Sequence, residues 1–287
     1  MAAERLYLVD ASIYVFRGWH VLPDTIRDAA GEPANAVHGF ADFLLGLLER
    51  ARPRRAAVAF DESLASSIRN DIYPAYKANR APAPDELRRQ FGHCRELVEA
   101  AGLAAFSSPR YEADDLLGTL AASMRAHGLR HTVVTGDKDL AQLVRTGDEW
   151  WDFARDVRLD LAGVTARFGV SPHRIPDLLA LAGDRIDNIP GVPGVGMATA
   201  ARLLRRWPDL DALFDNLDGV RSMRFRGAPR VAGLLAEHEA TVRLARRLTA
   251  TLEVEGLPTT PAALERSAPD EAALEDRSEE RRVGKEC

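Results

Sequence analysis

The sequence predicts an α/β protein in which a parallel sheet with covering helices is followed by a smaller, all-helical domain. Short apolar runs alternate with helix-periodic stretches in the first half of the chain, as in strand–helix–strand units. Three of these runs lead directly into acidic residues, which parallel strands would place along one edge of the sheet. After Phe153 the pattern turns wholly helical.

Composition indicates a globular protein, because 287 residues with 46% hydrophobic content can bury a sizeable core. Glu4 and Arg5 near the start, with no long apolar run behind them, argue against a signal peptide, and no segment is long enough to span a bilayer. We therefore expect a cytoplasmic protein without membrane contact. Two cysteines and seven scattered histidines give no disulfide framework and no zinc spacing.

The net charge of -5 hides two basic regions. Residues 50–95 contain ten Lys or Arg against five Asp or Glu, and residues 201–250 contain ten against six. Basic regions on both sides of an acidic centre fit a surface that follows a phosphate backbone around a metal site.

The first strand is expected at Leu6–Val9 and ends at Asp10. Asn35 is expected to cap an amphipathic helix. The second strand, Ala56–Phe60, runs into Asp61. Since ligands of parallel sheets bind beyond the carboxyl ends of the strands, both acids fall at a candidate site.

Residues 62–84 form a connection much longer than the usual length of about 4 to 6 residues. Tyr73, Tyr76, Lys77 and Arg80 interleave aromatic and basic side chains there, a composition that stacks bases and binds the phosphates of single strands. The alternative is a polar surface loop without a function.

The next elements are a helix from Pro84 to Ala100 and a short strand at Ala104–Phe106. A further helix follows Asp115, with its leucines toward the core. The strand His131–Thr135 then leads into the motif Gly136–Asp139. A third strand thus brings acids to the same edge of the sheet.

Seven acids are expected to converge at this edge: Asp10, Asp61, Glu112, Asp114, Asp115, Asp137 and Asp139. Acids also favour a helix N-terminus for local reasons, which is the alternative for the central group. Two unit charges about 4 Å apart repel by roughly 4 kcal/mol at an effective dielectric near 20, so the full set calls for a balancing cation. Hard oxygen ligands of this kind select Mg²⁺ or Mn²⁺.

The second domain is expected to span residues 161–257, after a first domain of residues 1–160. A helix beginning near Pro172 is followed by a turn rich in Gly and Pro, residues 183–196, and by a helix from Met197 to Arg206. The glycines let backbone amides approach a phosphate. The alternative is a helix connection without a function, which would have the same Gly- and Pro-rich composition. Residues 258–276 are expected to form a loose tail, and residues 277–287 resemble translated sequencing-adapter DNA.

The ordered motifs resemble those of bacterial 5′-3′ exonucleases, the flap-endonuclease relatives that also form the N-terminal domain of DNA polymerase I. The resemblance covers roughly residues 6 to 249, and it is closest to the stand-alone members. The motifs that carry it are Val9–Ser12, Phe60–Asp61, Tyr76–Arg80, Tyr111–Asp115, Gly136–Asp139 and Gly183–Asn188. The resemblance implies a parallel-sheet, PIN-like nuclease core with a helical arch at residues 62–84, followed by a helix-3-turn-helix domain.

The resemblance also implies a two-metal site with nine carboxylates, the seven named above together with Asp184 and Asp187. One Mg²⁺ would use Asp61, Glu112, Asp114 and Asp115, with Asp10 acting through water, and the other would use Asp137, Asp139, Asp184 and Asp187. Mn²⁺ can substitute for Mg²⁺. Lys77 and Arg80 match catalytic residues that hold the scissile phosphate.

Further residues match DNA contacts of the family: Arg17, Tyr73, Tyr76, Gly191, Gly194, Gly196, Thr199 and Arg202. The turn also resembles a K⁺ site built from backbone carbonyls. One residue departs from the pattern, because Ala198 stands where the family usually has Lys. That change removes one duplex-phosphate contact, for which Arg202 or Arg205 can compensate.

The sequence therefore predicts a metal-dependent 5′ nuclease, a monomer acting on branched or 5′-ended DNA and on RNA primer strands during replication and repair. A DNA-binding accessory protein without catalysis is one alternative. A metal-dependent ribonuclease with the same core fold is another, although such ribonucleases normally lack the second domain.

Overall fold

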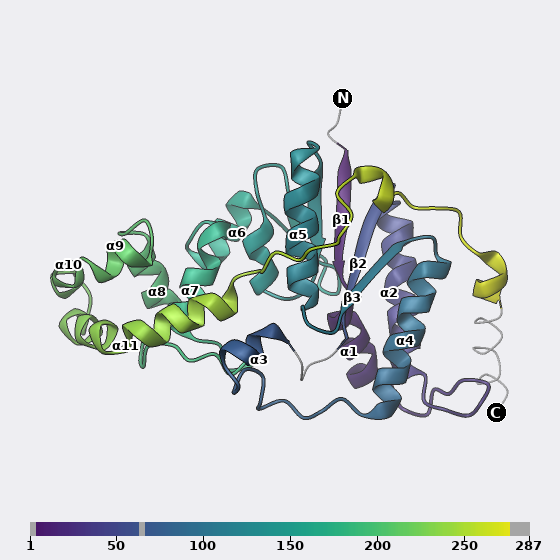
Figure 1. Cartoon of the computed structure of the whole chain (residues 1–287), viewed down its shortest axis with the longest axis horizontal. Helices are drawn as coiled ribbons and strands as arrows, with labels where there is room; N and C mark the ends of the chain where they lie inside the picture. The colour runs from purple at the N-terminus through teal and green to yellow at the C-terminus, as the bar shows by residue number, and fades with distance from the viewer. Residues whose placement is uncertain (1–3, 63–66, 276–287) are drawn as a thin grey trace.

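The computed structural model describes residues 4–62 and 67–275. The molecule is elongated, with a sheet and its helices at one end and a helical domain at the other (Figure 1). Segment 277–287, interpreted as adapter-derived, lies outside the described residues, as do residues 63–66 of the expected arch. No helix within the described ranges has both the length and the apolar run that crossing a membrane requires.

A six-stranded sheet forms the centre of the first domain, in the order β3-β2-β1-β4-β5-β6. Its first five strands in the chain are parallel and β6 is antiparallel to β5. The strands are β1 (Arg5–Asp10), β2 (Arg55–Asp61), β3 (Ala104–Ser108), β4 (Arg130–Val134), β5 (Glu149–Asp152) and β6 (Val157–Asp160). The first four confirm the predicted strands and the parallel sheet.

The hairpin of β5 and β6 was not predicted, and the expectation of a wholly helical pattern after Phe153 is wrong. Both strands have only four residues, too few to show a clear period of two. Trp150 and Trp151 are buried in β5. The Arg158 guanidinium of β6 lies 3.7 Å from the centre of the Trp151 ring, so an aromatic–cation contact stabilises this edge.

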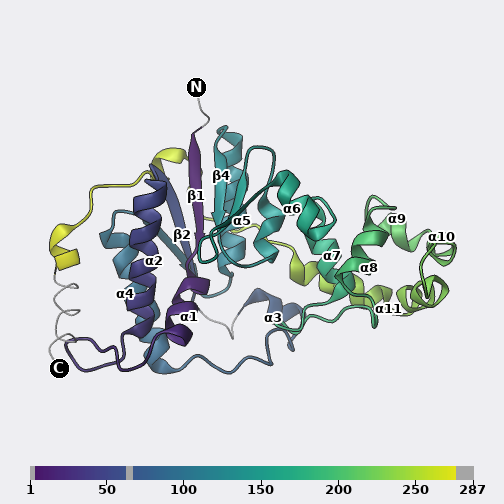
Figure 2. The same ribbon diagram turned by 180° about the vertical axis from the view of Figure 1, so that it is seen from behind.

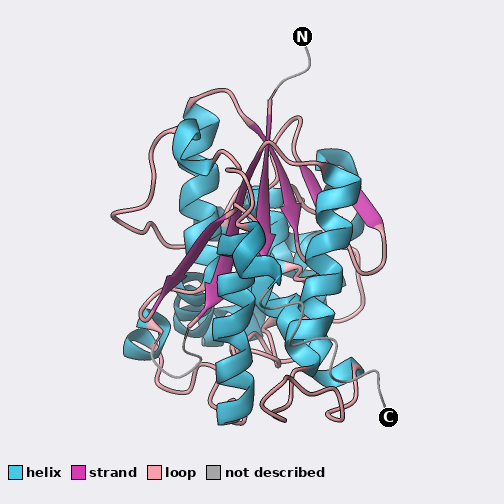
Figure 3. Cartoon of the chain, turned by 90° about the vertical axis from the view of Figure 1, so that its right-hand side faces the viewer, coloured by secondary structure: helices cyan, strands magenta, loops and turns pink. Residues whose placement is uncertain are grey.

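Helices cover both faces of the sheet, as Figure 3 shows. One face packs on α1 (Ala11–Val21), α2 (Asn35–Ala51) and α4 (Asp85–Ala100), and the other packs on α5 (Ala113–Ala126). Side chains of β2 alternate between the two cores: Val58 belongs to the first and Ala57 to the second. Burial on both faces explains why these strands read as continuous apolar runs.

Asn35 does not cap α2 as predicted. Its side-chain amide donates instead to the carbonyl oxygens of Trp19, at 3.0 Å, and Leu22, at 3.2 Å. The first backbone amides of α2 are satisfied by the side-chain oxygen of Gln90 on α4, 2.7 Å from the Ala36 nitrogen. A tertiary contact thus replaces the local cap.

Residues 67–84 of the long connection contain less helix than the arch that the resemblance implied. Within its described part there is one short helix, α3 (Ile68–Ile72), followed by turns up to residue 80. These turns lie against the carboxyl edge of the sheet, beside the helical domain (Figure 2).

The helical domain has a core of its own, which includes Leu178, Leu203 and Leu235. Helices α7 and α8, joined by the turn of residues 183–196, confirm the predicted helix–turn–helix arrangement. The helices are α6 (Leu161–Phe168), α7 (Ile175–Ala182), α8 (Met197–Leu204), α9 (Leu210–Phe214), α10 (Leu217–Arg221) and α11 (Ala228–Thr249). After α11 the chain returns to the sheet (Figure 1).

The expectation of a loose tail is wrong for residues 258–270, which lie against the first domain. Leu264 is fully buried in the core beside α5. Glu265 pairs with Arg55 at the start of β2, and the Ser267 amide donates to the Gly102 carbonyl at 2.9 Å. The Pro- and Glu-rich composition concealed these long-range contacts, because single-sequence patterns report only local preferences.

Candidate active site

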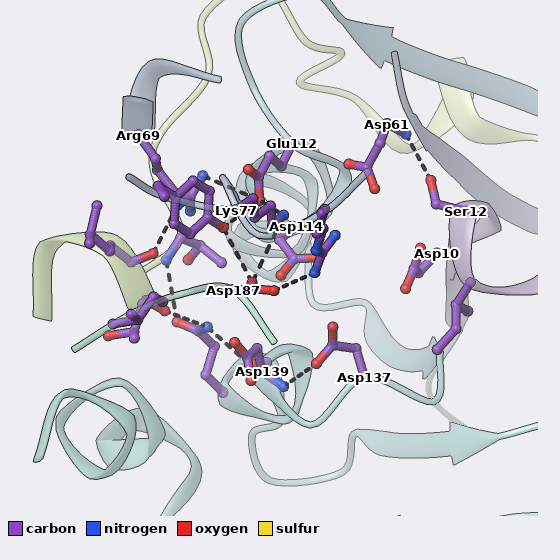
Figure 4. Close-up of a pocket in the computed structure, with 18 of the residues that line it drawn as sticks. Asp10, Ser12, Asp61, Arg69, Lys77, Glu112, Asp114, Asp137, Asp139 and Asp187 are labelled. Carbon is purple, nitrogen blue, oxygen red and sulfur yellow. Dashed lines mark hydrogen bonds and ion pairs between the residues drawn. The ribbon is translucent and has the colours of Figure 1, made fainter. Parts of the chain in front are cut away.

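A cavity of about 200 Å³ lies at the carboxyl edge of the sheet, between the sheet domain and the helical domain. Figure 4 shows carboxylates from both domains pointing into it. The predicted site residues that line it are Asp10, Asp61, Tyr76, Lys77, Arg80, Glu112, Asp114, Asp137, Asp139 and Asp187. Seven of the nine predicted acids and both predicted catalytic cations are thus brought together.

Thr135, just beyond β4, fixes two of these acids. Its hydroxyl donates to Asp10 Oδ2 at 2.8 Å and accepts from the Asp137 amide at 2.9 Å. The Asp139 amide in turn donates to Asp137 Oδ1 at 2.9 Å. The ends of two neighbouring strands are therefore held in one hydrogen-bonded unit, in which Thr135 is a site residue that the sequence analysis missed.

Asp61, the last residue of β2, connects that strand to α5. Its Oδ1 accepts from the Ala113 amide at 2.9 Å, in the first turn of α5, where a negative charge is favourable. The Asp61 amide donates to the hydroxyl of Ser12 at 2.8 Å. Ser12, also missed, thereby holds α1 and β2 in register at the cavity.

Two cations of the long connection neutralise acids of the cavity. Lys77 Nζ lies 2.8 Å from Glu112 Oε2 and 3.9 Å from Asp187 Oδ2, and Arg80 pairs with Asp187. Lys77 has a left-handed backbone (φ 54°), held by its amide, which donates to the Asp187 carbonyl at 2.9 Å. Burial would raise the pKa of Glu112, but Lys77 and Arg69 lower it overall.

The other acids with shifted pKa values are less fully compensated, although Lys138 Nζ lies 3.4 Å from Asp139 Oδ1. Burial, with the nearby charges of Asp61 and Asp137, raises the pKa of Asp10 to about 7. Burial and the charge of Asp137 raise the pKa of Asp139 to about 8. The pKa of Asp114 is raised for the same reasons. The cluster therefore holds protons at neutral pH unless a cation is bound.

The donor set fits divalent cations, since it consists of hard carboxylate oxygens. Asp139 Oδ1 is buried and accepts no hydrogen bond, with only the ion pair to Lys138 at 3.4 Å, so it can serve as a ligand. Among the described residues, no three acids yet meet in a preformed metal cluster. Lys77 and Arg80 lie among these acids instead.

Two predicted metal ligands do not line the cavity. Asp115 is completely buried behind it, where Arg69 donates to both of its oxygens at 2.7 and 2.8 Å and the Leu252 amide donates at 2.7 Å. Asp184 pairs with Lys138. Both acids have their charge satisfied by the protein, so the geometry favours positioning roles for them over metal ligation.

Arg69 of α3 is the main site-shaping residue that the sequence analysis missed. Besides Asp115, its guanidinium donates to the carbonyl oxygens of Leu248, at 2.8 Å, and Ala250, at 2.9 Å. It therefore joins the long connection, the first turn of α5 and the end of α11. An arginine in a polar loop gives no sequence signal that separates this buried role from a solvated one.

The predicted base-stacking tyrosines are not exposed. Tyr76 is buried, and its hydroxyl donates to Glu112 Oε2 at 3.0 Å. Tyr73 is half-buried against the core of the helical domain. Arg17 is exposed on α1 but does not line the cavity. In this conformation Tyr76 therefore orients an acid and cannot stack on a base.

The predicted glycines of the turn do not line the cavity, although Asp187 of the same turn does. A Cβ on Gly191 would come within 2.3 Å of the Gly183 nitrogen, so this position requires glycine, and Gly194 has a φ of 77°. Gly196 precedes α8, which carries Thr199 and the exposed Arg202. These predicted DNA contacts form a second surface on the helical domain.

The raised pKa values predict how the stability of the metal-free protein depends on pH. Asp10 and Asp139 bind protons more tightly in the folded chain than in the unfolded chain, where the pKa of an aspartate carboxyl is near 3.8. Their contribution to the free energy of unfolding is therefore complete below about pH 4 and is lost as the pH rises through 7 to 8. Urea unfolding in EDTA should show this fall, and saturating Mg²⁺ should reduce it.

Two family models together match nearly the whole described chain. One, described as "5'-3' exonuclease, N-terminal resolvase-like domain", matches residues 5–169, and the other, "5'-3' exonuclease, C-terminal SAM fold", matches residues 170–272. The chain belongs to the 5′-3′ exonuclease family. The models meet nine residues beyond the predicted boundary at residue 160, so α6 falls within the first model.

Relatives of this 5′-3′ exonuclease chain include bacterial DNA polymerases I. The enzyme of Rhizobium leguminosarum is 40% identical over 230 residues, 78% of this chain and 22% of the relative. That of Mycobacterium tuberculosis is 37% identical over 269 residues, 92% of this chain and 29% of the relative. The chain thus spans less than a third of the length of these polymerases.

Solved structures share the fold of this family member. The bacteriophage T5 5′-exonuclease with bound divalent metal ions (zinc) has a TM-score of 0.70 at 19% identity, covering 86% of this chain and 89% of that chain. The catalytic core of Rad2 in complex with a DNA substrate has a TM-score of 0.63 at 17% identity, covering 96% and 87%. Both share the predicted fold, a parallel-sheet core followed by a helical domain.

Proposed function

We propose that this chain is a divalent-metal-dependent 5′-3′ exonuclease and structure-specific 5′ flap endonuclease, which hydrolyses DNA phosphodiester bonds in replication and repair. One observation carries the proposal: seven carboxylates from both domains surround one cavity, with Lys77 and Arg80 at its side. Membership of the 5′-3′ exonuclease family supports it. The metal ions and DNA bound to the T5 and Rad2 proteins support the same chemistry.

We assign the cavity acids to two Mg²⁺ sites, in which Mn²⁺ can substitute. Asp61, Glu112 and Asp114 would hold one ion, with Asp10 acting through water, and Asp137, Asp139 and Asp187 would hold the other. When bound, the ions would activate water and stabilise the leaving oxygen. Asp115 and Asp184 would orient these ligands from behind. A K⁺ ion on the carbonyls of residues 183–196 remains a further proposal.

Lys77 and Arg80 would bind the scissile phosphate. Both now neutralise Glu112 and Asp187, so their charges are balanced inside the protein. Divalent cations on these acids would release the two side chains, and the phosphate would then balance them. This exchange keeps the buried charge compensated at each stage, which a low-dielectric cavity requires.

We place the duplex on the helical domain. Backbone amides at the turn before α8, with Thr199 and Arg202, would hold its phosphates without reading sequence. Ala198 and Arg202 lie four residues apart and so share one face of α8. Arg202 is therefore positioned to replace the lysine contact that Ala198 lacks. Branched or 5′-ended DNA and RNA primer strands are the proposed substrates of a monomeric, cytoplasmic protein.

The substrate proposal is tested by comparing three 5′-labelled nucleic acids in Mg²⁺: a DNA flap duplex, the same flap made of RNA, and single-stranded DNA. Short labelled products from the DNA flap are expected. Tight binding of the flap without products would instead favour the accessory role. Cleavage confined to RNA would favour the ribonuclease.

Substituting Lys77 with methionine should lower the single-turnover cleavage rate by about 10²-fold or more at saturating DNA, because an oriented charge on the reacting phosphate is lost. Affinity for the uncut duplex should change less than threefold. Arg110→Met is the matched control, since Arg110 is exposed and its one ion pair within the described ranges is with the exposed Asp71. Equal rates for the two variants would remove Lys77 from the mechanism.

A further inference from the structure

The stretch that joins α10 to α11 carries an unusual concentration of positive charge. Between Asp218 and Glu237 the sequence has four arginines and no acid. These are Arg221, Arg224, Arg226 and Arg230. In a chain with a net charge of -5, such a run is a local feature and does not follow from overall composition.

Phe225 anchors this stretch. Phe225 and Met223 are half-buried and pack against the core of the helical domain, whereas Arg224 and Arg226 on either side of the ring are exposed. Backbone bonds hold the turn: the Phe225 amide donates to the Met223 carbonyl at 3.0 Å, and Gly227 has a φ of 86°. The two guanidiniums are therefore displayed from a fixed backbone.

Three of the four arginines have no acidic partner among the described residues. Arg221 pairs with Asp218 at 3.3 Å, but Arg224, Arg226 and Arg230 make no side-chain ion pair with any described residue. The planar guanidinium group of arginine can donate hydrogen bonds to two phosphate oxygens at once. The charge of these three arginines is thus available to an anionic partner.

This surface continues onto α8. The Arg202 guanidinium lies 5.4 Å from the centre of the Phe225 ring, which places the arginine-rich turn beside the exposed face of that helix. Arg202, Arg224 and Arg226 therefore form one cationic strip. Figures 1 and 2 show that the turn between α10 and α11 lies at the end of the molecule away from the sheet.

We propose that Arg224 and Arg226 bind the phosphate backbone of duplex DNA, extending the α8 surface to a second contact distant from the scissile bond. The inference rests on the proposed function and adds to it a second place where the protein contacts the duplex. Because the strip is remote from the carboxylates, it contributes to substrate affinity and not to the chemical step. Because contacts to phosphate oxygens carry no base-sequence information, this contact is independent of sequence.

The test is fluorescence anisotropy of a labelled DNA duplex in EDTA across a salt series, with the variant Arg224→Gln/Arg226→Gln. The Kd should rise about tenfold, and the slope of log K against log salt should fall in magnitude by about 2, one unit for each lost phosphate contact. Arg52→Gln is the matched control, because Arg52 is exposed, has no acidic partner among the described residues and precedes β2 at the opposite edge of the sheet. Circular dichroism should show unchanged folding for both variants.

A Kd and a salt slope equal to those of the Arg52→Gln control would overturn the proposal. So would a reduced cleavage rate at saturating DNA with an unchanged Kd, because that result would place the arginines in the chemical step. Binding is measured without metal, so it is independent of cleavage. If the wild-type chain instead bound the duplex with a steeper slope of log K against log salt than the double variant, but never cut DNA, the proposed function would be refuted. The proposed phosphate contact of Arg224 and Arg226 would still hold.

Discussion

Asp114→Asn is expected to lower the rate of flap cleavage by about 10³-fold or more while raising the melting temperature of the metal-free protein. The rate falls because a ligand worth several kcal/mol of metal-assisted stabilisation is lost. The stability rises because Asp114 is buried among acids that raise its pKa, so asparagine removes a repulsion. Calorimetry in EDTA and single-turnover cleavage in Mg²⁺ measure the two effects.

Asp148→Asn provides the matched control for this prediction. Asp148 is also buried, but it accepts from Arg125 and from the His131 amide, each at 2.8 Å, and with these contacts its pKa falls to about 2 although burial opposes ionisation. The same substitution should therefore lower the melting temperature and spare cleavage. If Asp114→Asn destabilised the metal-free protein as much as Asp148→Asn, the repulsive cluster would be the wrong description of the cavity.

Arg69→Met is expected to lower the free energy of unfolding by about 3 to 5 kcal/mol, because it leaves the carboxylate of Asp115 buried without a cation. The double variant Arg69→Met/Asp115→Asn should lose clearly less than the sum of the single losses, since the uncompensated charge is gone. Urea denaturation measures the free energy of unfolding of both single variants and of the double variant.

The exposed pair of Arg110 and Asp71, at 2.8 Å, is the internal reference for this experiment. Breaking it with Arg110→Met should cost at most about 1 kcal/mol. A loss of that small size for Arg69→Met, or strictly additive losses in the double variant, would show that Arg69 and Asp115 do not form a buried structural unit.

Much of the sheet and cavity could be predicted because the sequence signals are local. The apolar runs before Asp10 and Asp61 are continuous since both faces of those strands are covered, and a parallel sheet places the following acids at one edge. The convergence of most of the predicted acids follows from that one topological rule.

Other features depend on contacts between distant residues and left no local signal. Arg69 reaches Asp115, 46 residues later, and Leu248, 179 residues later. Residues 258–275 resemble a disordered tail in composition, yet Leu264 completes a core that begins at Leu6. Tyr76 was expected at the surface because it lies among polar residues, but its hydroxyl donates a hydrogen bond to Glu112 inside the cavity.

The measurement that tests the central claim most directly is cleavage of a 5′-labelled DNA flap by the full chain, first in Mg²⁺ and then with excess EDTA. We expect short 5′-labelled products that appear with Mg²⁺ and are absent with the chelator. Products formed at the same rate in EDTA would contradict a metal-dependent nuclease, as would an intact flap that is bound in Mg²⁺ but never cut.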